Sequence, residues 1–372
     1  MTPLDAATYA DPYPYYAQLR QASGLWFDPG LGLWVASRAD TVAAILAHPA
    51  CRVRPPGEPV PQAIAHGAAG QVFGRLMRMN DGARQQCPRQ AIEPLLSAVT
   101  IEHIAQSVAR AWGSTDDLNE LMFSVPVSVM ALLLGFAPSQ LPEVARYTRD
   151  FVACLSPLSD AAQRRDADFA AVRLSQLFSG LLLQPGSLLK AIGRHNVDAE
   201  TLIANLIGVL SQTCEATAGL IGNSLVALQR HPQRHEAICQ APALASAWVE
   251  EVARYDSPVQ NTRRFVAERC VIGESVLEVG DIVLLLLASA NRDPVGNPDP
   301  DSFLLERRSR RIFSFGSGKH QCPGQHLALS IASMVLQVVL ARQPATLTRP
   351  FSYWPSLNSR IPKFHDVQET AP

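Results

Sequence analysis

The chain is organised around the stretch Phe313-Ser-Phe-Gly-Ser-Gly-Lys-His-Gln-Cys-Pro-Gly324. It places Cys322 in a glycine-rich loop directly before an apolar run over residues 327–340. Glycines let the backbone turn tightly and approach a bound group closely, and Pro323 has a φ suited to the first turn of a helix. We therefore expect Cys322 at a helix N-terminus, where unpaired N–H groups and the helix dipole favour a thiolate.

Three roles are open to Cys322. A buried cysteine beside a turn is the commonest fate of cysteine in general. A nucleophilic cysteine needs a general base, which His320 could supply. A metal ligand is the third role. Zinc takes three or four clustered Cys and His ligands, and only His320 and His326 lie near, whereas a haem iron needs one protein thiolate.

The loop from Phe315 to Gly324 resembles the haem-binding signature of the cytochrome P-450 family. In that family the cysteine is the proximal iron ligand, the phenylalanine packs near the sulfur and the histidine meets a haem propionate. The resemblance implies that Cys322 ligates the iron of a haem b (iron protoporphyrin IX). The other residues of this loop that the resemblance assigns to haem binding are Phe315, Gly316, Gly318, His320 and Gly324.

Length, composition and charge limit the class of protein. The chain has 372 residues, of which 47% are hydrophobic, enough for a sizeable core. A net charge of -1 gives no electrostatic case for binding nucleic acid or an anionic membrane. We find no signal peptide and no run of about 18 uncharged apolar residues, so we expect a cytoplasmic protein outside the membrane. Seven cysteines without paired spacing favour a reducing compartment.

The resemblance implies the cytochrome P-450 fold, which is mainly α-helical with a small β-rich lobe. We expect this lobe mainly from residues 25–60 and 260–290, within a single domain over residues 1–372. The expected elements are a helix over 15–21, a strand over 31–36, a helix over 41–48, a loop over 52–72, helices over 101–190 with breaks at 126, 135–138, 156–157 and 185–186, and a strand over 282–288. No glycine fingerprint for a nucleotide occurs in the sequence, so a fused flavin or nicotinamide domain is not expected.

A long helix with a polar centre is the second region where we expect chemistry. Asp198 is a plausible N-cap for a helical pattern that runs to residue 231, about 50 Å at 1.5 Å per residue. Apolar residues cover most of its circumference, yet its middle is Ser211-Gln-Thr-Cys-Glu-Ala-Thr217. A buried carboxylate such as Glu215 is costly unless paired. Two interpretations are open. The cluster marks a functional site, or it is structural, with Glu215 paired to a basic residue and the threonine hydroxyls hydrogen-bonded to backbone carbonyls.

By the family resemblance this helix crosses the distal face of the haem, where a small residue, a glycine, an acid and a threonine deliver protons. An alignment on residues 220–223 places Glu215 at the acid and Ala216 at the threonine. It also places Thr213 at the glycine and Gln212 at the small residue. The usual alcohol is therefore missing, and the pocket is expected to be tighter, with a hydrogen bond available to the substrate.

Because this alcohol is missing, we expect proton delivery to differ from that usual in the family. A substrate hydroxyl, an ordered water or Thr213 one turn away could replace it, or the reaction is not an ordinary hydroxylation. Thr217 is one position along, which turns its side chain by about 100°, so it can substitute only if the helix bulges.

A further motif carries the resemblance beyond the cysteine loop and the long helix. Glu251 and Arg254 lie three residues apart on one helix face and resemble the family's Glu-x-x-Arg element, a structural brace. The arginine that often completes this element is replaced by Ser302, and Arg307 or Arg308 is the candidate to compensate.

Further haem and substrate contacts follow from the resemblance alone. Arg264, with Arg263 as its alternative, and Arg89 are implied as propionate partners, and Gln85 stands where the family commonly has a histidine. The residues implied in substrate contact are those of the loop over 57–79, Gln212, Val259, Gln260, Asn261, Thr262, Tyr353 and Trp354.

The resemblance implies a monooxygenase of secondary metabolism that oxidises a small or medium-sized organic molecule. Without an electron-transfer domain of its own it would take electrons from a ferredoxin and ferredoxin reductase, and we expect a monomer. A peroxide-driven or non-hydroxylating reaction, such as coupling or rearrangement, is the first alternative. A haem-based gas or redox sensor is the second.

Overall fold

The computed structural model describes residues 1–112, 116–184 and 197–366. The chain divides into two units, which are taken separately here. The first comprises residues 1–55, 218–322 and 332–372, and the second comprises residues 56–217 and 323–331. Every strand in the described residues belongs to the first unit.

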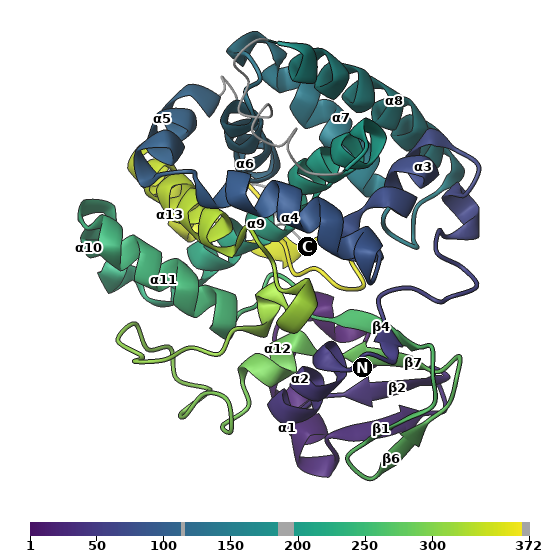
Figure 1. The fold of residues 1–372 in the computed structure, drawn as a ribbon. Helices are drawn as coiled ribbons and strands as arrows, with labels where there is room; N and C mark the ends of the chain where they lie inside the picture. The colour runs from purple at the N-terminus through teal and green to yellow at the C-terminus, as the bar shows by residue number, and fades with distance from the viewer. Residues whose placement is uncertain (113–115, 185–196, 367–372) are drawn as a thin grey trace. The chain divides into compact units, whose positions relative to one another are not determined.

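A five-stranded sheet is the centre of the first unit (Figure 1). The strands lie in the order β1 (Leu25–Asp28), β2 (Leu33–Ala36), β7 (Ile282–Leu285), β4 (Thr262–Val266) and β3 (Cys51–Arg52). The β2–β7 pair is parallel, and the other pairs are antiparallel. Two short hairpins accompany the sheet: β5 (Cys270–Ile272) with β6 (Ser275–Leu277), and β8 (Phe351–Tyr353) with β9 (Pro362–Phe364).

Both faces of the sheet are buried, because successive residues of a strand point to opposite faces. Val35 and Leu284 pack in one apolar cluster with Tyr16 of α1 (Tyr13–Ala22). Their neighbours, among them Ala36 and Leu285, pack in another cluster with α2 (Ala39–Ala47). The first unit also contains the short helices α10 (His235–Gln240), α11 (Pro242–Tyr255) and α12 (Leu287–Asn291).

The described part of the second unit is helical. Its helices are α3 (Ala68–Arg75), α4 (Ala83–Ser97), α5 (Ile101–Ala111), α6 (Leu118–Leu134), α7 (Leu141–Ala153) and α8 (Ala161–Leu183). The apolar helix α6 is buried on nearly all sides and adjoins α5 and α7, while α8 adjoins α7 and α3. Gly135 ends α6 with a φ of 105°, a conformation that glycine adopts without strain.

Two long helices join segments of both units. Helix α9 (Ala199–Arg230) has 32 residues and is α-helical from end to end. The side chain of Asp198 accepts a hydrogen bond from the Thr201 N–H at 2.8 Å, so the expected N-cap is confirmed. Helix α13 (Gln325–Arg342) is long and apolar enough to cross a membrane by length and composition alone, but half of that window is buried in the fold, as in a core helix.

Four expected boundaries were wrong. The segment over 52–72 contains η2 (Gln62–Ile64) and the start of α3, whose Ala69 N–H donates to the Asp168 carboxylate of α8 at 2.9 Å, a contact that no local pattern reveals. Pro126 lies inside α6 and does not break it, because that helix is held by burial. The apolar run over 282–288 changes from strand to helix at Leu287, since uniform hydrophobicity does not separate the two. Helix α13 begins at Gln325, so Pro323 precedes its first turn.

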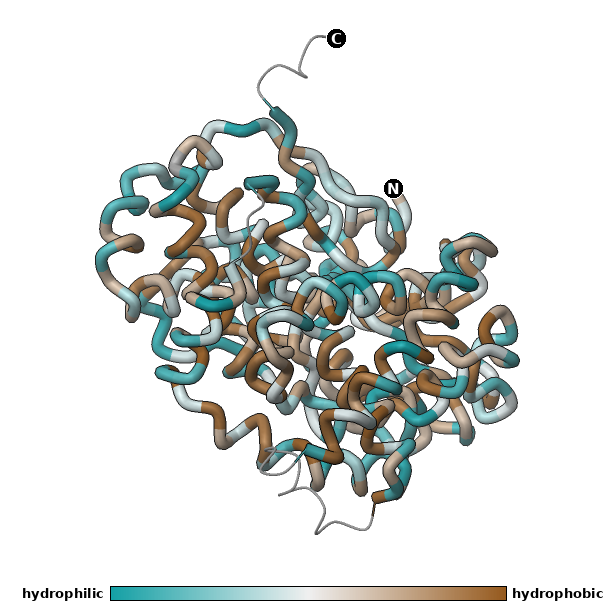
Figure 2. Tube along the Cα trace, turned by 90° about the horizontal axis from the view of Figure 1, so that it is seen from above, coloured by the Kyte–Doolittle hydropathy of each residue, from teal (hydrophilic) through white to brown (hydrophobic). Residues whose placement is uncertain are grey.

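The fold class is confirmed as mainly α with small sheets. Figure 2 shows hydrophobic and hydrophilic residues alternating along the helices, which is the pattern that buried helix faces require. The expected break at residues 185–186 lies outside the described residues.

Candidate functional site

The loop around Cys322 is a closed turn. The Cys322 N–H donates to the Phe315 carbonyl at 2.8 Å, across two short 3-10 segments, η7 (Phe313–Phe315) and η8 (Gly318–His320). Gly316 has a φ of 70°, and a Cβ atom there would lie 3.2 Å from the His320 carbonyl oxygen. The turn therefore requires glycine at this position, and it leaves the Cys322 side chain partly exposed.

Helices α11 and α12 anchor the start of this loop. The Phe313 N–H donates to the Asn291 Oδ1 atom at 2.5 Å, and the Ser314 hydroxyl donates to the Ala253 carbonyl at 2.6 Å. Asn291 also donates from Nδ2 to the Ser314 hydroxyl at 2.9 Å. These residues are buried, so the loop is fixed to the core of the first unit at its first two residues.

Glu251 and Arg254 form a fully buried ion pair, with the Arg254 Nη2 atom 2.6 Å from the Glu251 Oε1 atom. Arg310 contacts the same carboxylate at 3.0 Å and Arg307 at 3.4 Å. Burial acts to raise the pKa of Glu251, but the Arg254 guanidinium and further donors hold it below its usual value. The expected brace is thus present. Of the two candidate arginines Arg307 takes part, and Arg310 was not anticipated.

The arginines expected to bind propionates lie in different surroundings. Arg264 is buried in β4 opposite Val283, and its Nη1 atom donates to the Arg263 carbonyl at 2.8 Å. Arg89 in α4 holds Glu93 with both Nε and Nη2, at 3.0 and 3.1 Å. Gln85, one turn earlier in α4, is buried. His320 is half-buried at the end of η8.

The centre of α9 has one half-exposed face within an otherwise buried helix. Its members are Gln212, Thr213, Glu215 and Ala216, which a period of 3.6 residues brings to one side. Gln212 and Thr213 donate back to the carbonyls of Gly208 and Val209, at 3.0 and 2.9 Å. Thr217 is buried outside this face, and no bulge turns it towards the face.

Arg78 is a residue of this region that sequence reasoning missed. It lies in η3 (Met77–Met79), and the atom Nε is buried without a hydrogen-bond partner among the described residues. Burial lowers the pKa of its guanidinium, and the charge of Glu215 opposes that shift. Arg78 is therefore a basic residue whose charge interacts with that of Glu215 on the half-exposed face of α9.

Asn205 and Gly208 of α9 set the position of η3. The Asn205 side chain accepts from the Met77 N–H at 2.6 Å and donates to the Arg75 carbonyl at 2.8 Å. A Cβ atom on Gly208 would lie 2.8 Å from a methyl group of Leu76. The contact spans more than a hundred positions in sequence, and no sequence signal could have identified it.

Two of the residues expected to contact substrate are used by the fold itself. Gln260 is fully buried, accepts from the Tyr16 hydroxyl at 2.9 Å and donates to the Ser257 carbonyl at 2.7 Å. Asn261 is buried and donates to the Leu357 carbonyl at 2.8 Å. These bonds give both side chains a structural role, and their contact with substrate stays a prediction. The Tyr353 hydroxyl accepts a hydrogen bond from the Arg360 Nη2 atom at 2.7 Å. Val259 packs against the apolar cluster on one face of the sheet.

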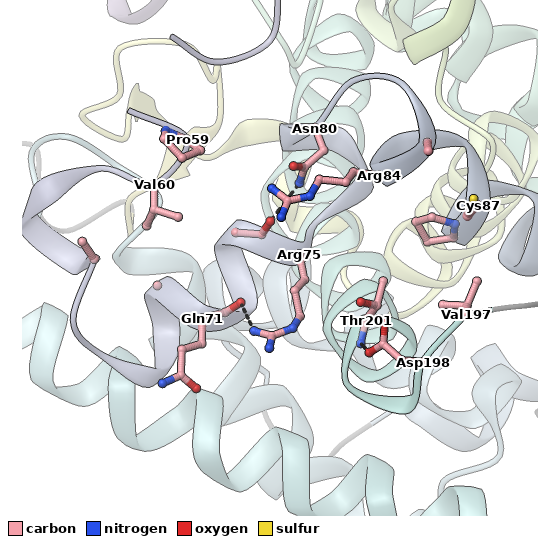
Figure 3. Close-up of a pocket in the computed structure, with 15 residues that line it drawn as sticks. Pro59, Val60, Gln71, Arg75, Asn80, Arg84, Cys87, Val197, Asp198 and Thr201 are labelled. Carbon is pink, nitrogen blue, oxygen red and sulfur yellow. Dashed lines mark hydrogen bonds between the residues drawn. The ribbon is translucent and has the colours of Figure 1, made fainter. Parts of the chain in front are cut away.

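A pocket of about 660 Å³ opens in the second unit (Figure 3). Residues 59–60, α3, and the starts of α4 and α9 line it, and Figure 3 shows Arg75 bonded to the Gln71 carbonyl. Part of the segment expected to cover the substrate therefore borders a pocket. Its described lining residues include none from 212–216, so this pocket is separate from the half-exposed face of α9.

Comparison with known proteins gives this geometry a context. The family model described as Cytochrome P450 matches residues 201–344. The monooxygenase PikC of Streptomyces venezuelae is 29% identical over 90% of this chain and 84% of its own. This chain belongs to the cytochrome P450 family.

Other P450s agree with this assignment. The vitamin D(3) 25-hydroxylase of Pseudonocardia autotrophica is 33% identical, over 62% of this chain and 59% of its own length. The chain thus spans less than two thirds of that relative. The crystal structure of CalO2 has a TM-score of 0.84 at 23% identity, covering 98% of this chain and 97% of its own, which shows the fold. As a P450, the chain is an oxidoreductase of a haem-binding family.

The residues present fit a haem. A single, partly exposed thiol in a glycine-bent turn suits a soft metal that takes one protein ligand. Gly316 has a φ of 70°, which side chains rarely allow, and a glycine lets the backbone approach a bound group closely. The buried arginine Arg264 supplies a cation of the kind that a propionate needs.

Proposed function

We propose that this P450 is a monooxygenase that oxidises a small or medium-sized organic molecule and holds haem b through Cys322. The observation that carries the proposal is the closed turn around the partly exposed Cys322 thiol. When bound, a haem with a thiolate ligand activates dioxygen for insertion into an organic substrate. We propose the whole chain as one haem-thiolate domain, monomeric and cytoplasmic.

In this proposal His320 and Arg264 hold the propionates, and Phe315, Gly318 and Gly324 shape the loop. Arg89 is the weaker candidate, because Glu93 already occupies its guanidinium. Gln85 beside it is a neutral donor at the position where the family has a histidine. Electrons would come from a ferredoxin and its reductase, since no flavin or nicotinamide fingerprint occurs in the sequence.

On the distal helix, the proposal assigns proton handling to Glu215 and Thr213, with Ala216 leaving space for a substrate hydroxyl or a water. Arg78 is assigned as the counter-charge of the Glu215 carboxylate, because the charge of Glu215 acts on the pKa of the Arg78 guanidinium. Gln212 is half-exposed beside them, and its amide can offer the substrate a hydrogen bond. Thr217 is the least suited of these residues, because it is buried.

A comparison of electron donors tests this function. Ligands that shift the haem spectrum of the purified protein would first be selected from a library of small organic molecules. Each would then be incubated with reduced ferredoxin and, separately, with hydrogen peroxide. We expect oxygenated product with ferredoxin; selected ligands that give no oxygenated product with either donor would contradict the monooxygenase proposal.

A second candidate is a peroxide-driven or non-hydroxylating reaction, such as coupling or rearrangement. Ala216 favours it, because such chemistry does not need the alcohol that this helix lacks. Product formed with peroxide but not with ferredoxin, or product without an added oxygen atom, would select this candidate.

A further inference from the structure

Three soft-metal ligands meet in the first unit, away from Cys322. The ligand atoms of His48, Cys51 and Cys270 all lie within 4.8 Å of one another. Both cysteines are buried, 5% and 8% exposed, while His48 is half-buried. No local pattern in the sequence indicates this group, because Cys270 comes from a distant part of the chain.

Backbone hydrogen bonds hold the two contributing segments in place. His48-Pro-Ala-Cys51 is a tight turn after α2, in which the Cys51 N–H donates to the His48 carbonyl at 3.1 Å. The Ala267 N–H donates to the Ala50 carbonyl at 2.8 Å, and Cys51 lies opposite Val266 in the sheet. Cys270 follows as the first residue of β5. The turn and the sheet therefore place His48 and Cys51, while Cys270 lies in the separate β5–β6 hairpin, four residues after the end of β4.

We propose that His48, Cys51 and Cys270 bind a zinc ion as a structural site of the β-rich unit. Two thiolates and one imidazole are a ligand set that zinc accepts in tetrahedral geometry, and the half-exposed side of His48 leaves a fourth position for water. Two thiolates neutralise the charge of Zn²⁺, so the site adds no net charge to a buried region.

Binding is balanced by proton release. Ordinary cysteine thiols are mostly protonated at pH 7, so Zn²⁺ replaces two S–H protons and forms two Zn–S bonds, with no change of oxidation state. The Ala50 N–H donates to the His48 Nδ1 atom at 3.2 Å in the metal-free chain. If zinc binds Nδ1, that atom no longer accepts a hydrogen bond from the Ala50 N–H. If zinc binds Nε2, the ring proton lies on Nδ1, which then cannot accept either. The hydrogen bond between Ala50 and His48 is therefore lost in both modes.

Two other states of the group are distinguishable from zinc binding. In one, Cys51 and Cys270 are core thiols, since both pack in the apolar cluster on that face of the sheet. In the other, an oxidant such as molecular oxygen takes up two electrons and two protons and the cysteines form a disulfide. Neither of these states leaves a metal on the protein.

The experiment uses the full-length, haem-loaded protein with the exposed Cys87 replaced by serine, to remove a surface thiol. One equivalent of ZnCl₂ is added, unbound metal is removed by gel filtration, and retained zinc is measured by mass spectrometry. Cys51→Ser, Cys270→Ser and His48→Gln are compared with Cys154→Ser, a matched buried cysteine in the second unit. X-ray absorption at the zinc edge of the parent protein identifies the ligands.

We expect one zinc per chain, two protons released, and two sulfur ligands at about 2.3 Å with one nitrogen at about 2.0 Å. Each of the three substitutions should remove the retained zinc, while Cys154→Ser keeps it. Zinc that is not retained, a coordination shell without sulfur, retention unaffected by Cys51→Ser, or a Cys51–Cys270 disulfide in the non-reduced peptide map would each overturn the proposal. The outcome is independent of the haem, because none of these readouts uses the haem spectrum.

Discussion

At the scale of single residues, Ala216 and Arg78 distinguish this P450. By the family resemblance Ala216 stands where an alcohol is expected on the half-exposed face of α9, and the charge of Glu215 on the same face acts on the pKa of Arg78. An ionised carboxylate paired with arginine accepts a proton less readily than a free one, because the pair stabilises its charged form. We propose that both residues affect the protonation of the same carboxyl group, that of Glu215.

Restoring the alcohol tests whether proton delivery is limited there. With Ala216→Thr we expect a larger share of electrons to reach the product and hydrogen peroxide release to fall several-fold, because a threonine hydroxyl completes the acid–alcohol pair. The measurement is product and peroxide formed per NADH in the ferredoxin-driven reaction. Unchanged coupling and unchanged peroxide release would show that proton delivery does not depend on this position.

A double-mutant cycle with Arg78→Gln extends this test. If both residues act through Glu215, their effects on peroxide release should not add, as is usual for residues that share a partner. Asn205, which fixes η3, supplies the structural control: Asn205→Asp keeps Arg78 but disturbs its support. Strictly additive effects of Ala216→Thr and Arg78→Gln would contradict a shared partner.

The motif residues could be predicted from the sequence, and their partners could not. Cys322, Glu251 and Arg254 stand in short patterns of fixed spacing, where local geometry dictates the residue type. Arg78 meets Glu215 only because Asn205 and Gly208 bring two distant segments together. Chemistry that depends on such long-range packing has no local signal in the sequence.

At the scale of elements, α9 carries the packing of two regions. Beyond its polar centre, Gly219 lets the helix approach the segment that contains Arg360, since a Cβ atom there would lie 2.9 Å from the Arg360 carbonyl oxygen and 3.0 Å from the Pro258 Cβ atom. The length and the N-cap of α9 followed from its uninterrupted apolar pattern and from Asp198. The close approach at Gly219 did not follow from the sequence, because intrinsic helix propensity favours alanine over glycine.

Substituting glycines in two helices separates packing from propensity. Gly219→Ala should destabilise the protein by about 1–3 kcal/mol, because the contact is with backbone that cannot move aside. Gly180→Ala in α8, where no atom lies within 4 Å of the added Cβ, should stabilise it by about 0.5–1 kcal/mol. Urea unfolding of the haem-loaded proteins measures both. The two substitutions are expected to act in opposite directions, and stabilisation by Gly219→Ala would refute the close approach.

At the scale of the whole molecule, buried ion pairs join distant parts of the chain within the first unit. Arg360 contacts Asp256 at 2.8 Å and also donates to the carbonyls of Ala7 and Ala10, at 3.1 and 2.9 Å. The Tyr13 hydroxyl donates to the Asp256 carboxylate at 2.9 Å. The N-terminal segment, the end of α11 and the C-terminal hairpin are thus tied to one carboxylate. Sequence reasoning did not find this network, which has no fixed spacing.

Low pH should weaken the ion pair and the hydrogen bond that Asp256 makes with Arg360 and Tyr13. Burial acts to raise the pKa of Asp256, but Arg360 and the Tyr13 hydroxyl hold it below its usual value. A carboxyl group whose pKa is lower in the folded state contributes stability above its unfolded pKa of about 3.9, and this stability is lost as pH falls through the folded pKa. We therefore expect the free energy of unfolding to hold from pH 7 to about pH 5 and then to decline.

Asp256→Asn provides the control for this pH dependence. The variant lacks the titrating group, so its free energy of unfolding should start lower at pH 7 and decline less steeply below pH 5. Urea unfolding at a series of pH values measures both slopes. If the free energy of unfolding declined equally steeply below pH 5 in the variant and the parent, Asp256 would not be the cause of the pH dependence.

The spectrum of the reduced protein with carbon monoxide tests the central claim most directly. A thiolate ligand shifts the main absorption band of this complex to longer wavelength, and we predict this red shift for the parent protein and for Cys87→Ser. Cys322→Ser should lose the shift even where haem is still bound. A parent spectrum without the red shift, or a red shift that survives in Cys322→Ser, would contradict the assignment of Cys322 as the ligand of the haem iron.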